Sequence, residues 1–356
     1  MQAIRTQVAG IDVHKEVLVI TVLIGEADQE PKATQFECAT FTEDLMKCGK
    51  KLLEFGVTDV ALESTGVYWK PVYNVLDPLG IRVTVGNASH IKNVPGRKTD
   101  MNDSHWIAQL HRFGLIRASF VPGSEWQRMR LLSRHRTNLV DDLSRVKNRV
   151  QKVLEDGNVK YGSVVSDVFG VAGLEVLRLI AGGVLHPETL AAAVKTNIKR
   201  KEELRKSLTH CLTRDHCYVI GELMKQHDEL QKKIEDVEKE LMEKMSPYAH
   251  LIEELKKIPG LDQISAMGIL TETTADMSHF KDERRFAAWA GVAPGNNESA
   301  GKKKRSKCRL GNPHLRWMLV QAAHNAKNKR GSFYRSKYNK LKFKLGCKSS
   351  RLHAFP

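Results

Sequence analysis

The chain has 356 residues, which is enough for two or three domains with a hydrophobic core each and excludes a short binding module. It contains no run of 18 apolar residues and begins without the apolar stretch of a signal peptide, so we expect a cytoplasmic protein with no membrane partner. The net charge of +16 comes entirely from residues 301–356, where 17 Lys or Arg stand without any Asp or Glu. A basic block that also contains aromatic residues favours nucleic acid as its partner.

The six cysteines are scattered without any C-x-x-C pair, which argues against a zinc site and against a disulfide framework. Cys211 and Cys217 have His210 and His216 beside them, but this spacing fits no common zinc pattern. We expect reduced thiols that mainly contribute to packing.

The N-terminal region predicts an α/β domain. Residues 7–24 form two β-branched runs that are interrupted near His14, the pattern of a hairpin. A strand near 35–41, helices over 42–55 and 67–76, strands over 59–63 and 81–85, and a helix that opens near Thr99 follow in chain order. Three strands followed by alternating helix and strand predict a mixed five-stranded sheet with helices on its faces.

Residues 124–156 predict one long helix, because apolar side chains recur at intervals of three and four. Eight Arg or Lys lie between Arg128 and Lys152, against two Asp. This basic surface is either a solvated helix face or a surface that meets phosphate groups.

A heptad pattern over residues 220–241, with His227 at one core position, predicts a helical linker with a coiled coil. The pattern fits an intramolecular hairpin or a dimer, and it slightly favours the dimer. Pro247 limits this helix, and a new domain is expected to start near Leu251. We therefore expect a catalytic domain with its trailing basic helix over 1–160, a helical linker over 161–246 and a mainly α-helical domain over 247–356.

Four acidic residues follow predicted strands or start a predicted helix. Asp12 ends the first strand and Glu63 the fourth, so neighbouring strands would bring the two carboxylates together. Asp100 and Asp103 are spaced i and i+3, which places them on one face of the helix expected there. Each residue alone has an ordinary alternative, as a turn cap, a surface acid or a helix-start acid.

Four converging carboxylates repel one another unless a cation lies between them. Carboxylate oxygens are the ligands that Mg²⁺ or Mn²⁺ prefers, and such ions stabilise the oxygens of a phosphoryl transfer. The combination predicts a metal site at Asp12, Glu63, Asp100 and Asp103 and chemistry on phosphodiesters.

The C-terminal region predicts two further features. Lys257 to Leu261 reads as a helix, a Pro259–Gly260 turn and a second helix, either a helix-hairpin-helix that grips phosphate or a plain helical hairpin. A polar loop then places Ser299 directly before a run of four cations, Lys302, Lys303, Lys304 and Arg305. Asn312 is expected to cap a following helix with Pro313 in its first turn. A loop serine is more often a turn residue than a nucleophile.

Four segments together resemble a known family over almost the whole chain. GIDVHK, ALESTGVYW and GRKTDMNDSHWIA are similar to the DEDD motif of bacterial insertion-sequence transposases described as bridge-RNA-guided recombinases, and WAGVAPGNNESAGKKK is similar to the serine motif of their C-terminal domain. The resemblance implies an N-terminal domain of the RNase H type, like the junction resolvase RuvC. It also implies Asp12, Glu63, Asp100 and Asp103 as catalytic acids and Ser299 as a nucleophile that forms a 5′-phosphoserine link with DNA.

The resemblance further implies the partners: donor and target DNA, a guide (bridge) RNA encoded beside the gene, and a homo-oligomer between dimer and tetramer, in a nucleoid-associated cytoplasmic location. The sequence differs from the family at its end, where it reads CKSSRLHAFP and the family continues with a further apolar helix. Two other functions stay open, a RuvC-like nuclease without a covalent intermediate and a non-catalytic nucleic-acid-binding protein.

Overall fold

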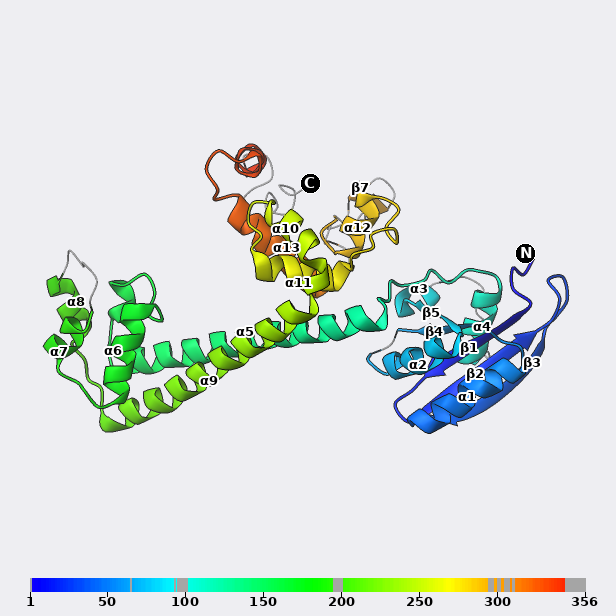
Figure 1. Cartoon of the computed structure of the whole chain (residues 1–356), viewed down its shortest axis with the longest axis horizontal. Coiled ribbons are helices and arrows are strands. Elements are labelled where there is room, and N and C mark those ends of the chain that lie inside the picture. The colour runs from blue at the N-terminus through cyan, green and yellow to red at the C-terminus, as the bar shows by residue number, and fades with distance from the viewer. Residues whose placement is uncertain are drawn as a thin grey trace. The chain divides into compact units, whose positions relative to one another are not determined.

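The structure is a computed structural model that describes residues 2–64, 66–92, 94, 102–194, 201–293, 298–299, 302–303, 308 and 311–342. The chain divides into two compact units, residues 1–124 and residues 125–356. Each unit is described by itself below, with the elements labelled as in Figure 1. The long helix that was expected to trail the first domain is counted with the second unit, and the three domain boundaries expected from the sequence stay predictions.

The first unit is built on a five-stranded mixed sheet with the strand order β3-β2-β1-β4-β5. Its strands are β1 (Gln7–Val13), β2 (Val17–Ile24), β3 (Lys32–Ala39), β4 (Asp59–Glu63) and β5 (Arg82–Gly86). β1 to β3 form an antiparallel meander, whereas β4 runs parallel to both β1 and β5. This arrangement confirms the expected mixed sheet.

Helices cover both faces of this sheet. α1 (Thr42–Glu54) and α2 (Trp69–Leu76) bury Leu45, Leu52 and Leu76 against Ile11, Leu62 and other strand residues of one face. α4 (Asp103–Arg112) covers the other face, where Trp106, Ile107 and Leu110 pack with Ala61. The short α3 (Ala88–Lys92) follows β5. Because strand side chains alternate between faces, Gly10 and Asp12 project toward the α4 face.

Gly10 lets α4 lie directly on the sheet. A Cβ atom at this position would come within 2.2 Å of the Ala108 nitrogen and the Ser104 carbonyl oxygen, both in the backbone of α4. The hydroxyls of Thr21 and Ser104 are hydrogen-bonded at 2.7 Å in the same buried layer. The first turn of α4 is thereby fixed over β1 and β2.

The second unit contains a hairpin of two long helices, α5 (Ser124–Asp156) and α9 (Arg214–Lys244), drawn from cyan to yellow-green in Figure 1. Leu139 and Leu143 of α5 pack against Ile234 of α9, and Arg136 Nε lies 2.6 Å from Glu238 Oε1. α6 (Val171–Ala181) packs on the start of α9, beside α7 (Pro187–Ala192) and α8 (Lys201–Ser207). Most heptad side chains of α9 are therefore buried within the second unit, as in the intramolecular alternative, whereas Leu230 and Val237 are only partly buried. Dimerisation stays a prediction.

The C-terminal part of the second unit is mainly helical. It comprises α10 (Ala249–Lys256), α11 (Gln263–Thr273), α12 (Glu283–Trp289), the two-residue strands β6 (Glu298–Ser299) and β7 (Lys302–Lys303), and α13 (Pro313–Ala326). Asn312 caps α13 by accepting hydrogen bonds from the His314 and Leu315 nitrogens, which confirms the predicted helix start. In the described ranges, no helix is long and apolar enough to cross a lipid bilayer.

Candidate functional site: an acidic edge of the sheet and a serine segment

Asp12 and Glu63 lie near the ends of neighbouring parallel strands. Ile11 of β1 is in register with Leu62 of β4, so the next residues, Asp12 and Glu63, lie side by side while they still pair with Val19 of β2 and Gly86 of β5. Both side chains are partly buried, with exposed fractions of 23% for Asp12 and 16% for Glu63. The structure thus brings together the two carboxylates that the strand pattern predicted to meet.

Asp103 reaches the same region from α4. It is the first residue of that helix, and the Asn102 side chain caps the helix by accepting a hydrogen bond from the Ser104 nitrogen. The helix begins later than the start expected near Thr99. Asp100 precedes the Asn102 cap, so α4 does not carry Asp100 and Asp103 on one helix face as expected. Asp100 lies outside the described residues, and its place at the site stays a prediction.

The three described acids influence one another electrostatically. Burial raises the pKa of Asp12 above its usual value, and the negative charges of Asp103 and Glu63 raise it further. His14 acts in the opposite direction, through its charge and a side-chain hydrogen bond. We call the carboxylates of Asp12, Glu63 and Asp103 the acidic edge.

Two basic side chains that the sequence reading did not single out border the acidic edge. His14 Nε2, in the β1–β2 turn, lies 3.2 Å from Asp12 Oδ2, and Lys92 Nζ, at the end of α3, lies 3.8 Å from Glu63 Oε1. His14 follows Asp12 by two residues, so the sequence could have predicted their proximity. Lys92 is far from Glu63 in the sequence, so no local pattern predicts that contact.

The donor set of the acidic edge fits a hard divalent cation, because it consists of carboxylate oxygens whose mutual repulsion a cation relieves. Among the residues that the structure describes, no three potential ligands stand close enough to form a metal site. The fourth predicted ligand, Asp100, is not among them. The metal ligands therefore stay a prediction that the chemistry of the donors supports.

The predicted serine lies on a short hairpin in the second unit, and we call residues 292–310, which contain it, the serine segment. Ser299 of β6 is in register with Lys302 of β7, and Glu298 with Lys303. The backbone thus places the serine next to the first two cations of the basic run. Lys304 and Arg305 lie outside the described residues, as do the side chains of Ser299, Lys302 and Lys303.

The Pro259–Gly260 turn connects α10 and α11 and packs against α13. Gly260 has a φ of +97°, and a Cβ atom there would come within 2.4 Å of the Ala322 carbonyl oxygen. Asp262 caps α11 by accepting a hydrogen bond from Ser265, which puts a carboxylate at the helix start. These contacts give Gly260 a packing role, and phosphate binding at Pro259 and Gly260 stays a prediction.

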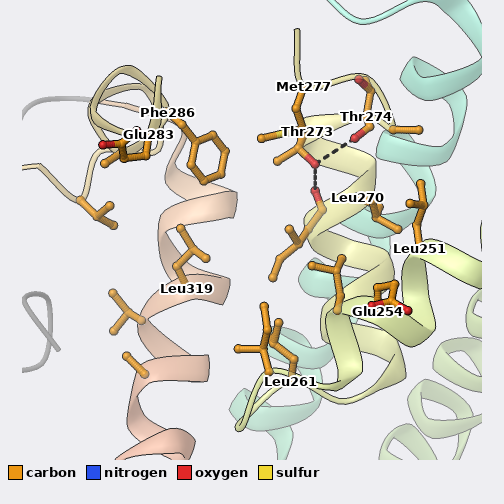
Figure 2. A pocket seen from close by; sticks show the side chains of 18 of the residues that line it. Leu251, Glu254, Leu261, Leu270, Thr273, Thr274, Met277, Glu283, Phe286 and Leu319 are labelled. Carbon is orange, nitrogen blue, oxygen red and sulfur yellow. Dashed lines mark hydrogen bonds between the residues drawn. The ribbon is translucent and has the colours of Figure 1, made fainter. Parts of the chain in front are cut away.

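The described residues of the C-terminal part of the second unit line an apolar cavity and a cationic cavity. The larger, about 850 Å³, is apolar, and Figure 2 shows Phe286 and Leu319 on one wall facing Leu261 and Leu270 on the other. The smaller cavity, about 400 Å³, is cationic. The sequence predicted that the basic tail as a whole binds nucleic acid, but it did not predict this cavity. The cavity is lined by Lys327, Asn328, Arg330, Arg335, Tyr338 and Asn339. Its charge suits a phosphate group.

Two family models match the chain in the regions just described. A model described as "Transposase", for the DEDD type of IS110, matches residues 9–158, which include the acidic edge. A second, described as "Transposase IS116/IS110/IS902 family", matches residues 252–339, which include the serine segment. The protein is therefore a transposase, an enzyme that cleaves and recombines DNA.

The two models describe two domains of one family and together match about two thirds of the chain. The chain belongs to the IS110 family of insertion-sequence transposases. The structure is also similar to that of Thermus thermophilus RuvC, over 32% of this chain and 99% of the RuvC chain, at 16% sequence identity and a TM-score of 0.25. No curated protein matches the sequence.

Proposed function

We propose that this transposase cuts and rejoins DNA through a covalent phosphoserine at Ser299, with a divalent cation at Asp12, Glu63, Asp100 and Asp103. The observation that carries the proposal is the acidic edge, where burial and the charges of Asp103 and Glu63 together raise the pKa of Asp12. Such an edge suits a cation and is unsuited to direct contact with a phosphate backbone. The cation is Mg²⁺ or Mn²⁺, because the ligands are oxygens.

In the proposed reaction, Ser299 Oγ attacks the phosphorus of a phosphodiester. The Oγ–P bond forms, the bond from phosphorus to the 3′ oxygen breaks, and the proton lost by the serine balances the one gained by the leaving 3′ hydroxyl. A 3′ hydroxyl of another strand then displaces the serine, so the bond energy is retained and rejoining needs no ATP. Asp12, Glu63, Asp100 and Asp103 would hold a Mg²⁺ ion, which would neutralise the charge that develops on the phosphate oxygens.

Other residues of the chain would bind the phosphate and the nucleic-acid backbone. Lys302 and Lys303 of β7 are in register with β6, which contains Ser299, and their charges would attract the phosphate. The cationic cavity around Arg330 and Arg335 offers a second site for the nucleic-acid backbone. The acidic edge and the serine segment belong to different units, which is consistent with an active site assembled from two copies of the chain in a dimer or tetramer.

RNA guidance and the nucleoid-associated location belong to the proposal through the resemblance of the sequence motifs. The 17 cations without an acid after residue 300 support an extended nucleic-acid surface of this kind. The donor and target DNA would then be selected by base pairing with the RNA, while the protein supplies phosphate contacts and chemistry.

The experiment that tests the acidic edge measures cleavage of labelled DNA that carries the joined ends of the insertion sequence. RNA transcribed from the DNA beside the gene and Mg²⁺ are included. Asp12→Asn, Glu63→Gln, Asp100→Asn and Asp103→Asn should each lower the cleavage rate by at least a hundredfold while DNA binding stays within about twofold, because neutral ligands hold the cation poorly.

Asp28→Asn, on an exposed turn of the same unit, is the matched control and should cleave like the unmodified protein. Cleavage by Asp12→Asn and Asp103→Asn at the unmodified rate would remove the acidic edge from the reaction. Cleavage that yields only free 5′ phosphates would instead favour a nuclease without a covalent intermediate.

A further inference from the structure

A buried carboxylate in the second unit has no role in the proposed chemistry. Glu272, near the end of α11, is only 1% exposed. Arg134 of α5 donates from Nε and Nη2 to its two carboxylate oxygens at 2.8 and 2.9 Å. Arg130 Nε lies 3.2 Å from Oε2, and Asn312 donates from Nδ2 to the same oxygen at 2.6 Å. Donors from α5 and from the start of α13 thus converge on one carboxylate.

The cluster is fully satisfied despite its burial. Burial alone would raise the pKa of Glu272, but the hydrogen bonds and charges of Arg134, Arg130 and Asn312 hold it below its usual value. Arg130 also donates to the carbonyl oxygens of Thr271 and Glu272 and so fixes the end of α11. Buried ion clusters are costly, and apolar side chains of similar volume often stabilise a fold as well. A role in setting geometry accounts for this cluster better than stability alone.

Asn312 connects the cluster to the start of α13. Its Oδ1 accepts hydrogen bonds from the His314 and Leu315 nitrogens, while its Nδ2 donates to Glu272. Its backbone nitrogen donates to the Trp289 carbonyl oxygen at 2.8 Å. One residue therefore joins α13 to α11 and to the end of α12.

The residues on either side of the serine segment meet at this point. A Cβ atom on Gly311 would come within 2.4 Å of the Gly291 nitrogen and 2.5 Å of the Trp289 carbonyl oxygen, so the two backbones are in direct contact. All residues from 292 to 310, including Ser299, lie between these two joined points. The base of the serine segment is thus closed by backbone contacts that Asn312 and Glu272 hold in place.

We propose that Glu272 is a positioning residue for Ser299: through Asn312 it fixes the base of the serine segment and so sets how the serine meets the DNA phosphate. The inference rests on the proposed phosphoserine chemistry. In this proposal Glu272 acts through the base of the segment, by way of its hydrogen bond from Asn312.

Two conservative variants of the full chain weaken this link. Asn312→Ser keeps an oxygen that caps α13 but removes the donor to Glu272. Glu272→Asp keeps the charge for the arginines but withdraws the carboxylate by one methylene group. Asp282→Ser is the matched control, because Asp282 caps α12 by accepting a hydrogen bond from the Arg285 nitrogen and has no bond to Glu272.

Two measurements separate positioning from general stability. Hydrogen exchange of peptides over 289–293 and 311–315 should rise at least tenfold in Asn312→Ser and Glu272→Asp, and stay unchanged in Asp282→Ser. The rate of covalent adduct formation with the labelled joined-end DNA should fall at least tenfold in the same two variants, with DNA affinity within about twofold and no change in the control.

Unchanged exchange at both peptides, or an equal loss of adduct rate in Asp282→Ser, would overturn the positioning role. If the unmodified protein forms no adduct while exchange responds as stated, the phosphoserine chemistry fails and the fixed base of the segment stands. The two proposals therefore fail separately.

Discussion

Carboxylates occur in two opposite environments in this chain. At the acidic edge, Asp12 lies near two further acids, and burial followed by their charges raises its pKa. At Glu272, Arg134 and Asn312 donate hydrogen bonds to one buried carboxylate and Arg130 forms an ion pair with it, and together they lower its pKa against the effect of burial. The difference teaches that burial of an acid by itself does not indicate a metal site. What matters is whether the protein already supplies the compensating cations, as it does at Glu272.

The largest expected effect comes from removing the charge of the satisfied cluster. Glu272→Gln should lower the free energy of unfolding by about 3 kcal/mol, because it leaves Arg130 and Arg134, both partly buried, without their counter-ion. Urea unfolding monitored at pH 7 measures this change. Glu253→Gln, which removes an exposed partner of Lys256, should cost less than about 1 kcal/mol.

The comparison of the unmodified protein with Glu272→Gln should also depend on pH. Because the pKa of Glu272 lies below its usual value of 4.5 in the folded protein, its contribution is present above pH 4.5 and is lost as the pH falls through the lowered pKa. The difference in stability between the unmodified protein and Glu272→Gln should stay constant from pH 7 to pH 5 and shrink below that. A difference that shrinks instead as the pH rises above 5 would contradict the charge balance described for this cluster.

An intermediate effect is expected where α4 meets the sheet. Gly10→Ala should lower the free energy of unfolding of the first unit by about 1 to 3 kcal/mol, because its Cβ would clash with the α4 backbone. The helix must then shift and carry Asp103 away from Asp12, so cleavage should fall as well. Gly123→Ala, where no atom lies within 4 Å of the added Cβ, is the control and should leave both measurements unchanged.

The smallest expected effect is a gain in stability, at Asp12. A carboxyl with a raised folded pKa stabilises the fold when protonated and loses that contribution as the pH rises, so ionised Asp12 opposes folding at pH 7. Asp12→Asn should therefore raise the free energy of unfolding without metal by less than about 1 kcal/mol, since solvent screens part of the repulsion. Thermal unfolding in EDTA measures it.

Addition of Mg²⁺ should make the unmodified protein more stable than Asp12→Asn. A ligand that binds only the folded state stabilises it by mass action, by about 2.7 kcal/mol at a hundred times its dissociation constant. The unmodified protein should therefore gain melting temperature in Mg²⁺ and Asp12→Asn should not. An equal gain in both proteins would place the Mg²⁺ away from the acidic edge.

Local sequence patterns predicted much of the first unit. The interrupted β-branched run predicted the β1–β2 hairpin, and alternation of strands and helices predicted that Asp12 and Glu63 would end neighbouring strands. The start of α4 was expected too early, although Asn102 is a favoured cap residue and its hydrogen bond with Ser104 is local. The Thr21–Ser104 hydrogen bond depends on tertiary contacts and could not be predicted.

The second unit was less predictable for the same reason. The heptad pattern of α9 showed which side chains would be buried, but it did not show that α5 and α6 of the same chain would cover them. Arg134 and Glu272 are separated by 138 positions, so no local pattern connects them. Asn312 was predicted as a helix cap, whereas its second bond, to Glu272, needed the structure.

The central claim, that Ser299 becomes covalently attached to DNA, is tested most directly by mapping the adduct. The protein is incubated with labelled joined-end DNA, the flanking RNA and Mg²⁺, and the DNA-linked peptide is identified by mass spectrometry after denaturing electrophoresis and protease treatment. We expect a phosphoserine link at Ser299 that is absent in Ser299→Ala and retained in Ser306→Ala. A link at Ser306, or cleaved DNA with free 5′ phosphates and no linked peptide at any time, would contradict the account.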